Sequence, residues 1–209
     1  MGARPSLNRP LRIPRRGTGS RWAGPLILAV GLVLLGGWAG GLVVGEWGQA
    51  AAEARWDQRF GPGGERPGQV PAPPGLARPL NGVDFRIRVP RLGYSGVVRE
   101  GVSDAVLFGG PGRYPRSVWP GQAGTVGVAA HNVYWLRFDQ LRPGDDVALD
   151  TRYGTFHYRV TGTRVVSPAD RSVLAAIPGR PRLVLTTCWP LWAGQLAPDR
   201  LAVFATAVT

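Results

Sequence analysis

The sequence contains no lysine, one cysteine, two histidines and one methionine, so all 25 of its basic residues are arginine. A single cysteine excludes an internal disulfide framework. A zinc site would have to combine Cys188, His131 and His157, and it would usually need three or four ligands with some of them closely spaced. No such close pair exists, so a metal centre is the least favoured interpretation.

Acidic residues are also scarce: there are 13, which leaves a formal net charge of +12. Half of this excess comes from residues 1–45, which hold six arginines and no acid. The rest of the chain has no basic cluster with interleaved aromatic residues, the pattern typical of nucleic-acid binding. We therefore expect no nucleic-acid partner.

Residues 23–45 carry no charge. As a helix with a rise of ~1.5 Å per residue they would extend about 34 Å, enough for a bilayer core of ~30 Å. Trp22 and Trp47 flank the run, as tryptophans do at membrane interfaces. We expect a basic cytoplasmic tail (1–22), a single-pass anchor in the cell membrane and an extracellular remainder. The alternative is a signal peptide that is cleaved near Ala50-Ala51-Ala52.

The anchor is followed by two segments of different composition. Residues 46–60 are rich in alanine and predict a continuation of the helix. Residues 61–79 repeat glycine and proline every few positions, which predicts a spacer. We take 46–80 as a helical stalk and linker and 81–209 as a separate domain.

The domain 81–209 has short stretches of apolar and polar alternation that predict β-strands. Few helices are expected: a turn capped by Ser103, and a helix that begins at Ser167-Pro168 and is over by Pro178. Residues 109–124 are expected to be a loop. The strands are expected at 84–89, 97–99, 125–130, 146–151, 155–160 (or on to 166), 182–189 and 201–208. This pattern favours an all-β barrel or sandwich.

The last two strands predict a reactive site. Cys188 lies where strand 182–189 meets a loop, and Arg200 opens the next strand. If the two strands form an antiparallel hairpin, Cys188 and Arg200 are neighbours. A thiol beside a guanidinium is a candidate nucleophile, because positive charge favours the thiolate.

A proton donor or acceptor must come from elsewhere in the chain. His131 follows a buried-strand pattern and lies at a strand end, whereas His157 lies within an alternating strand. We predict that His131 takes part in acid–base chemistry and that His157 is a solvated strand residue.

Each candidate also has a simpler interpretation. Cys188 could be a small buried hydrophobe, and His131 could be a capped loop residue. Arg200 could be a surface charge or the partner of Asp199.

Four motifs in this order resemble those of the sortase family: Gly127-Val128-Ala129-Ala130-His131-Asn132, Leu141-Arg142-Pro143-Gly144-Asp145, Leu185-Thr186-Thr187-Cys188 and Pro198-Asp199-Arg200. The resemblance covers about 84–209. The Cys-Trp-Pro…Pro-Asp-Arg ending is most similar to class D, with classes E and F as alternatives. Ala130 replaces the glycine of many sortases, and Asn132 replaces an arginine common in some classes.

The resemblance implies a sortase-type closed eight-stranded β-barrel and a cysteine transpeptidase. Cys188 would attack the threonine carbonyl of a C-terminal sorting signal and form a thioester, which an amine of the cell wall or of a pilin would resolve. His131 would exchange protons, and Arg200 would hold the substrate. Thr187, Asn132 and Trp189 would contact the substrate.

The resemblance implies no cofactor, and Asp145 and Asp146 do not predict a calcium site. Val133-Tyr134-Trp135 and the loop that contains Trp192 are expected to line the substrate groove. Two alternatives remain open: an extracytoplasmic cysteine peptidase that hydrolyses its substrate, and a membrane-tethered β-domain that binds without catalysis.

Overall fold

The computed structural model describes residues 23–61 and 66–208. Its first element, α1, is a 38-residue helix, Ala23–Phe60. The chain divides into two compact units, up to Leu42 and from Val43 onward. Among the helices that the structure describes, none has the length and apolar character that crossing a membrane requires. The predicted basic tail, 1–22, lies outside the described residues.

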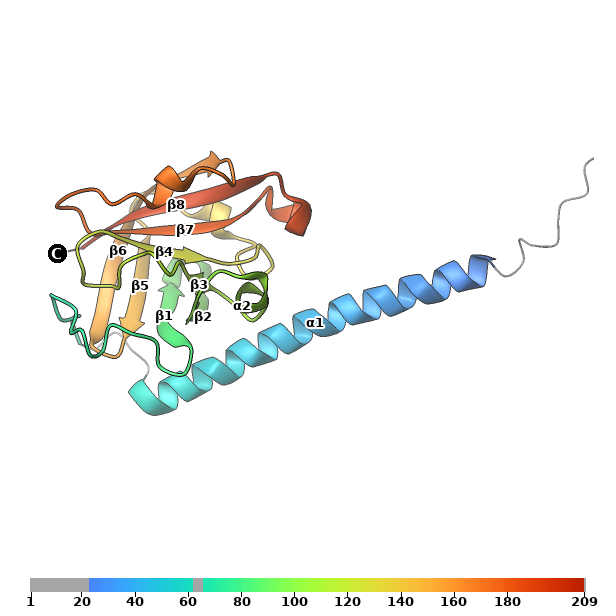
Figure 1. Ribbon diagram of the computed structural model, residues 1–209, viewed down its shortest axis with the longest axis horizontal. Coiled ribbons are helices and arrows are strands. Elements are labelled where there is room, and N and C mark those ends of the chain that lie inside the picture. Colours follow the sequence, from blue (N-terminus) through green and yellow to red (C-terminus); the bar gives the residue numbers. More distant parts are fainter. Residues whose placement is uncertain (1–22, 62–65, 209) are drawn as a thin grey trace, which may run out of the picture. The chain divides into compact units, whose positions relative to one another are not determined.

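The second unit contains a closed β-barrel (Figure 1). The strands that the structure describes are β1 Val83–Val89, β2 Tyr94–Glu100, β3 Gly112–Arg113, β4 Thr125–Ala129, β5 Asp146–Thr151, β6 Gly154–Val166, β7 Arg182–Trp189 and β8 Asp199–Ala207. Around the barrel their order is β1-β2-β3-β4-β7-β8-β6-β5. The all-β prediction and the eight-stranded barrel implied by the resemblance are both confirmed.

Short helical segments join the strands. They are η2 Pro90–Leu92, α2 Asp104–Phe108, η3 Phe138–Gln140, η4 Arg171–Leu174 and η5 Leu191–Leu196. The predicted helix start at Ser167-Pro168 is wrong. Asp170 caps η4 instead, because its carboxylate accepts a hydrogen bond from the backbone N–H of Ser172.

The sequence pattern did not predict β3, which falls in the stretch expected to be a loop. Two residues are too few for a visible alternation. The strand is held by its side chain instead: Arg113 is buried, and its Nε donates to Asp84 at 2.7 Å. Arg113 also pairs with Glu100 and lies over the ring of Trp119, 4.7 Å from the centroid.

The barrel interior is filled by every second residue of the strands. On β4 the inward residues include Val126 and Val128, and on β7 they include Leu183 and Leu185. Val203 and Ala205 of β8 complete this wall. Because side chains alternate along a strand, the residues between these positions face outward.

The end of α1 belongs to the barrel unit. Gln49 exchanges hydrogen bonds with the backbone of Val97 and donates to Gly109 O at 2.6 Å. Trp56 is 5% exposed within the main core, and Asp57 pairs with Arg86. This segment was predicted as a stalk, but the structure packs it against the strands.

The glycine- and proline-rich segment also lies on the barrel in its described part, 66–80. The backbone N–H of Gly68 donates to Thr155 O at 2.9 Å, and that of Gln69 donates to Tyr153 O at 3.0 Å. Arg152 donates to the carbonyls of Leu76 and Arg78. The glycine and proline content predicted a spacer. Composition could not show that the backbone of this segment is hydrogen-bonded to the barrel.

The contrast between two tryptophans on α1 gives a test of this packing. We expect Trp56→Ala to lower the free energy of unfolding by about 3–5 kcal/mol, because it leaves a cavity in the core. Trp47 is 75% exposed, so Trp47→Ala should change stability by less than about 0.5 kcal/mol. Chemical denaturation of the full chain in mild detergent measures both. Equal effects would contradict the packing of this helix end on the barrel.

Candidate active site

Strand register brings the three predicted catalytic residues to one face of the barrel. Strands β4 and β7 are parallel, with Ala129 opposite Thr186. His131 follows the end of β4 by two residues, and Cys188 follows Thr186 by two, so the same register continued past the strand end would set His131 next to Cys188. Strands β7 and β8 are antiparallel, with Cys188 directly opposite Arg200. The predicted hairpin is confirmed, and Cys188 and Arg200 are cross-strand neighbours on β7 and β8.

Cys188 is the penultimate residue of β7 and lies on the outer face of the barrel wall. It is a free cysteine and is 8% exposed. Its neighbour Thr187 faces inward, and the Thr187 hydroxyl is buried without a hydrogen-bond partner in the described part of the chain. The thiol therefore sits at the surface end of a rigid strand, close to solvent but shielded from it.

His131 lies two residues after the end of β4 and is half-buried. Its pKa is lowered from the ordinary value of 6.5, first because burial removes water from the imidazolium. The Arg200 guanidinium lowers this pKa further, and the Asp104 carboxylate raises it. Nε2 of His131 is buried and has no hydrogen-bond partner among the described residues, so it is available to a reacting group.

The Arg200 side chain is held by the backbone just before it. Its Nη1 donates to the backbone carbonyls of Ala197 at 3.2 Å and of Asp199 at 2.8 Å. Within the described ranges Arg200 forms no ion pair with a carboxylate, so pairing with the Asp199 side chain does not explain it. Two backbone contacts hold the guanidinium while its charge remains unneutralised.

Asn132 ties the histidine segment to the cysteine loop. It is 5% exposed, and its side-chain amide donates to the backbone carbonyl of Leu191. In the structure this residue positions its neighbours, and its contact with substrate stays a prediction. Trp189 is half-buried beside Cys188 and stays a candidate for substrate contact.

The aromatic stretch after Asn132 differs from the prediction. Trp135 is 1% exposed and stacks on Phe138 with a centroid distance of 4.3 Å, so it belongs to the core and does not line a groove. The Tyr134 hydroxyl donates a hydrogen bond to the backbone carbonyl of Phe108. Trp192 is 86% exposed in η5, as a residue of an outer loop wall would be.

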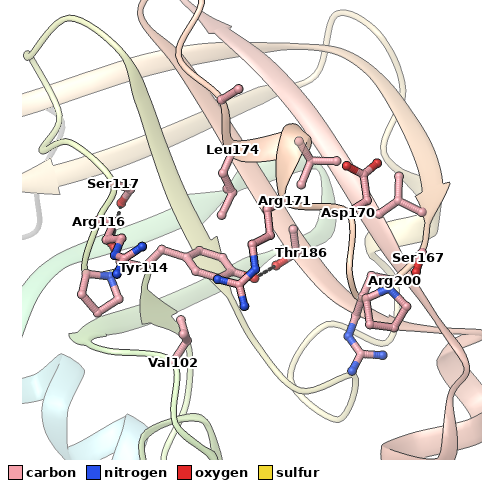
Figure 2. A pocket seen from close by; sticks show the side chains of 15 residues that line it. Val102, Tyr114, Arg116, Ser117, Ser167, Asp170, Arg171, Leu174, Thr186 and Arg200 are labelled. Atoms are coloured by element: carbon pink, nitrogen blue, oxygen red, sulfur yellow. Dashed lines mark hydrogen bonds between the residues drawn. The ribbon is translucent and has the colours of Figure 1, made fainter.

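A groove of about 590 Å³ runs along the outer face next to Arg200 (Figure 2). Thr186 of β7 forms part of it, and its hydroxyl is hydrogen-bonded to that of Tyr114 at 2.8 Å. The loop after β3 and the segment around η4 supply the two sides. Sequence patterns missed Tyr114 and the η4 residues, because neither segment has a motif that predicts a cleft.

The remaining titratable candidates lie elsewhere in the barrel. His157 is exposed on β6, and its Nδ1 lies 3.1 Å from the Asp146 carboxylate, as expected for a solvated strand residue. Asp145 pairs with Arg91 at 3.2 Å. No group of three or more metal-ligating side chains occurs in the described ranges, and the absence of a required metal or cofactor stays a prediction.

These positions have defined chemical capacities. A cysteine on a rigid strand can act as a nucleophile, and an imidazole of lowered pKa can give or take a proton near neutrality. A guanidinium provides fixed donors for a carbonyl oxygen on which negative charge develops. Together they suit acyl transfer.

Comparison with known protein families identifies the family of the chain. A family profile described as Sortase domain matches residues 87–208. The chain belongs to the sortase family. A similar curated sortase is Sortase D of Bacillus subtilis (strain 168), which is 28% identical over 124 residues. The match covers 59% of this chain and 63% of that sortase, so the chain spans less than two thirds of its relative.

Solved sortase structures are similar in fold. The Sortase D5 transpeptidase of Clostridium perfringens matches with a TM-score of 0.56 and 26% identity, covering 61% of this chain and 79% of that one. A pilus-related Sortase C of Group B Streptococcus matches with a TM-score of 0.58 and 25% identity, covering 63% and 70%. Class D and class C sortases thus share this barrel.

The electrostatics around His131 can be tested directly by titration. We expect the His131 imidazole to titrate below pH 6.5 and its pKa to rise in Arg200→Gln, because a nearby positive charge is removed. Asp104→Asn should lower the pKa instead. NMR titration suits the protein because the chain has two histidines. An unchanged His131 pKa in Arg200→Gln would contradict the arrangement.

Proposed function

We propose that this sortase is a membrane-anchored cysteine transpeptidase that acts through His131, Cys188 and Arg200. The observation that supports the proposal is the strand register: Cys188 lies opposite Arg200, and Ala129, two residues before His131, lies opposite Thr186, two residues before Cys188. The groove beside Arg200 provides room for a peptide along the same face. Family membership supports the same reaction class.

In the proposed reaction, the Cys188 thiolate attacks the carbonyl carbon of a threonine in a C-terminal sorting signal. The carbonyl oxygen becomes an oxyanion, and Arg200 donates hydrogen bonds to it. The tetrahedral intermediate collapses, the peptide C–N bond breaks, and protonated His131 gives its proton to the leaving amine. A thioester on Cys188 remains.

The second half of the reaction resolves the thioester. An amine attacks its carbonyl carbon, neutral His131 takes the proton, and the Cys188 sulfur leaves as a thiolate. The enzyme returns to its starting protonation state. Burial and Arg200 lower the pKa of His131, which favours its role as a base in this step over a charged resting form.

The proposed partners follow from the family. The donor is a secreted protein with a C-terminal sorting signal, and the acceptor is an amine of a cell-wall precursor or of a pilin. One structural relative is described as pilus-related and another as a transpeptidase. No cofactor enters the proposed steps.

We also propose that residues 23–45 anchor the enzyme in the cell membrane, with the N-terminus cytoplasmic and the catalytic domain extracellular. Support comes from the uncharged run itself and from the six arginines in the residues before it, as the positive-inside rule expects on the cytoplasmic side. Apolar side chains on the described part of this helix are exposed, including Ile27 at 72% and Val33 at 73%.

The proposed chemistry predicts a covalent intermediate. The full chain in mild detergent, mixed with peptides that carry sortase-type signals and with a glycine-based amine, should form an acyl adduct on Cys188 and then a transfer product, both read by mass spectrometry. Cys188→Ala should abolish both. His131→Ala should slow transfer by about 10²–10⁴-fold, and Arg200→Ala by about 10²–10³-fold.

His157→Ala is the matched control and should change the rate by less than about twofold, because His157 is distant from the site. Cleavage that the amine does not affect would indicate a hydrolase instead. A folded protein with a reduced thiol that forms no adduct with any signal peptide would contradict the proposed function and favour a binding domain.

A further inference from the structure

The groove that Thr186 and Arg200 line carries more positive charge than its own residues neutralise. Arg116, Arg171 and Arg200 line it, and Asp170 is its one carboxylate among the described residues. Asp170 is already engaged: it accepts hydrogen bonds from Ser172 N and Ser172 Oγ and lies 3.9 Å from Arg164. The groove therefore offers free cationic groups to a ligand.

Arg116 and Arg171, which we call the arginine pair, have no carboxylate partner in the described part of the chain. Both are exposed. Some arginines of the barrel are neutralised, since Arg86 and Arg88 pair with Asp150, and Arg113 pairs with Asp84. Other exposed arginines in the described ranges also lack an ion pair, and what distinguishes the arginine pair from them is its place in the lining of the groove.

The arginine pair stands on the two sides of the groove. Arg116 comes from the loop between β3 and β4, and Arg171 is the first residue of η4. Figure 2 shows the Arg171 side chain pointing from η4 toward the hydrogen-bonded Tyr114 and Thr186. A ligand that lies on Thr186 would thus meet a guanidinium.

The rest of the lining suits a peptide better than a small anion. The lining includes four larger apolar side chains besides the polar ones: Val102, Val166, Val173 and Leu174. A peptide can place apolar side chains against these and still direct one acidic side chain to the arginine pair.

We propose that the arginine pair selects sorting signals that carry an aspartate or glutamate near the cleaved threonine. Building on the proposed function, this names the substrate chemistry of the same groove. Thr186 lies two residues from Cys188 on β7, about 6.6 Å along the strand. An extended peptide advances ~3.3 Å per residue, so the acidic residue is expected within about one to three positions of the acylated threonine.

The test compares donor peptides that differ at one position at a time near the threonine, with Glu, Gln or Lys at that position. The full chain in mild detergent should show a kcat/KM for the best Glu peptide about three- to tenfold above its Gln counterpart, as expected for partly exposed ion pairs. High salt should reduce this ratio.

Substitutions then assign the effect to the arginine pair. Arg116→Gln combined with Arg171→Gln should bring the Glu/Gln ratio to about one, and Arg171→Glu should reverse the preference toward the Lys peptide. Arg142→Gln removes the same charge from an exposed position outside the groove, so it should leave the ratio unchanged.

Binding provides a readout that does not need turnover. Fluorescent versions of the same peptides, bound to the Cys188→Ala variant, should show the same Glu preference and the same loss with the double substitution. If binding shows this selectivity while no peptide reacts with the wild type, the inference stands and the transpeptidase proposal fails.

Other results would overturn the inference and leave the transpeptidase intact. One is transfer that depends on Cys188 but proceeds equally with Glu, Gln and Lys donors at every position. Another is a double substitution that raises KM for the amine acceptor alone, which would assign the arginine pair to the acceptor. Equal binding of all peptides together with no turnover would contradict both proposals.

Discussion

The backbone register of β7 with its two neighbours is the constraint on which the site depends. Side chains alternate along a strand, so a slip of one residue would turn Cys188 into the barrel and bring Thr187 to the surface. Apolar residues prevent the slip, since Leu183 and Leu185 are buried on the inner face together with Val203. The hydrophobic core thus fixes the chemistry on the outer face.

The same arrangement explains the electrostatics of the site. The parallel neighbour β4 ends two residues before His131, and the antiparallel neighbour β8 has Arg200 near its start, opposite Cys188. Both residues lie where strands meet loops, so they are held by the sheet and remain open to a substrate. Burial and the adjacent guanidinium lower the pKa of His131, while Asn132 ties the histidine segment to the loop after Cys188.

Residue patterns predicted what depends on periodicity and chain order. Runs of branched residues predicted the strands next to Cys188, His131 and Arg200. The succession of two strands joined by one loop predicted the hairpin that pairs Cys188 with Arg200. Other features depend on tertiary contacts that no local pattern carries. The two-residue strand β3 exists because Arg113 is held by Asp84, and residues 66–80 lie on the barrel through backbone hydrogen bonds. The groove forms between η4 and the loop that contains Tyr114, two segments that lie far apart in the sequence.

The central claim is that His131 lies beside Cys188, and a spin label can test it because Cys188 is the single cysteine and the chain has two histidines. With a nitroxide on Cys188, the imidazole NMR signals of His131, about one strand spacing (~5 Å) away, should broaden beyond detection. Val166 pairs with Arg200 on β8, and His157 lies nine residues from Val166 along β6, roughly 30 Å away. The His157 signals should therefore stay sharp. Equal broadening of the two histidines, or a sharp His131 signal, would contradict the register and with it the proposed site.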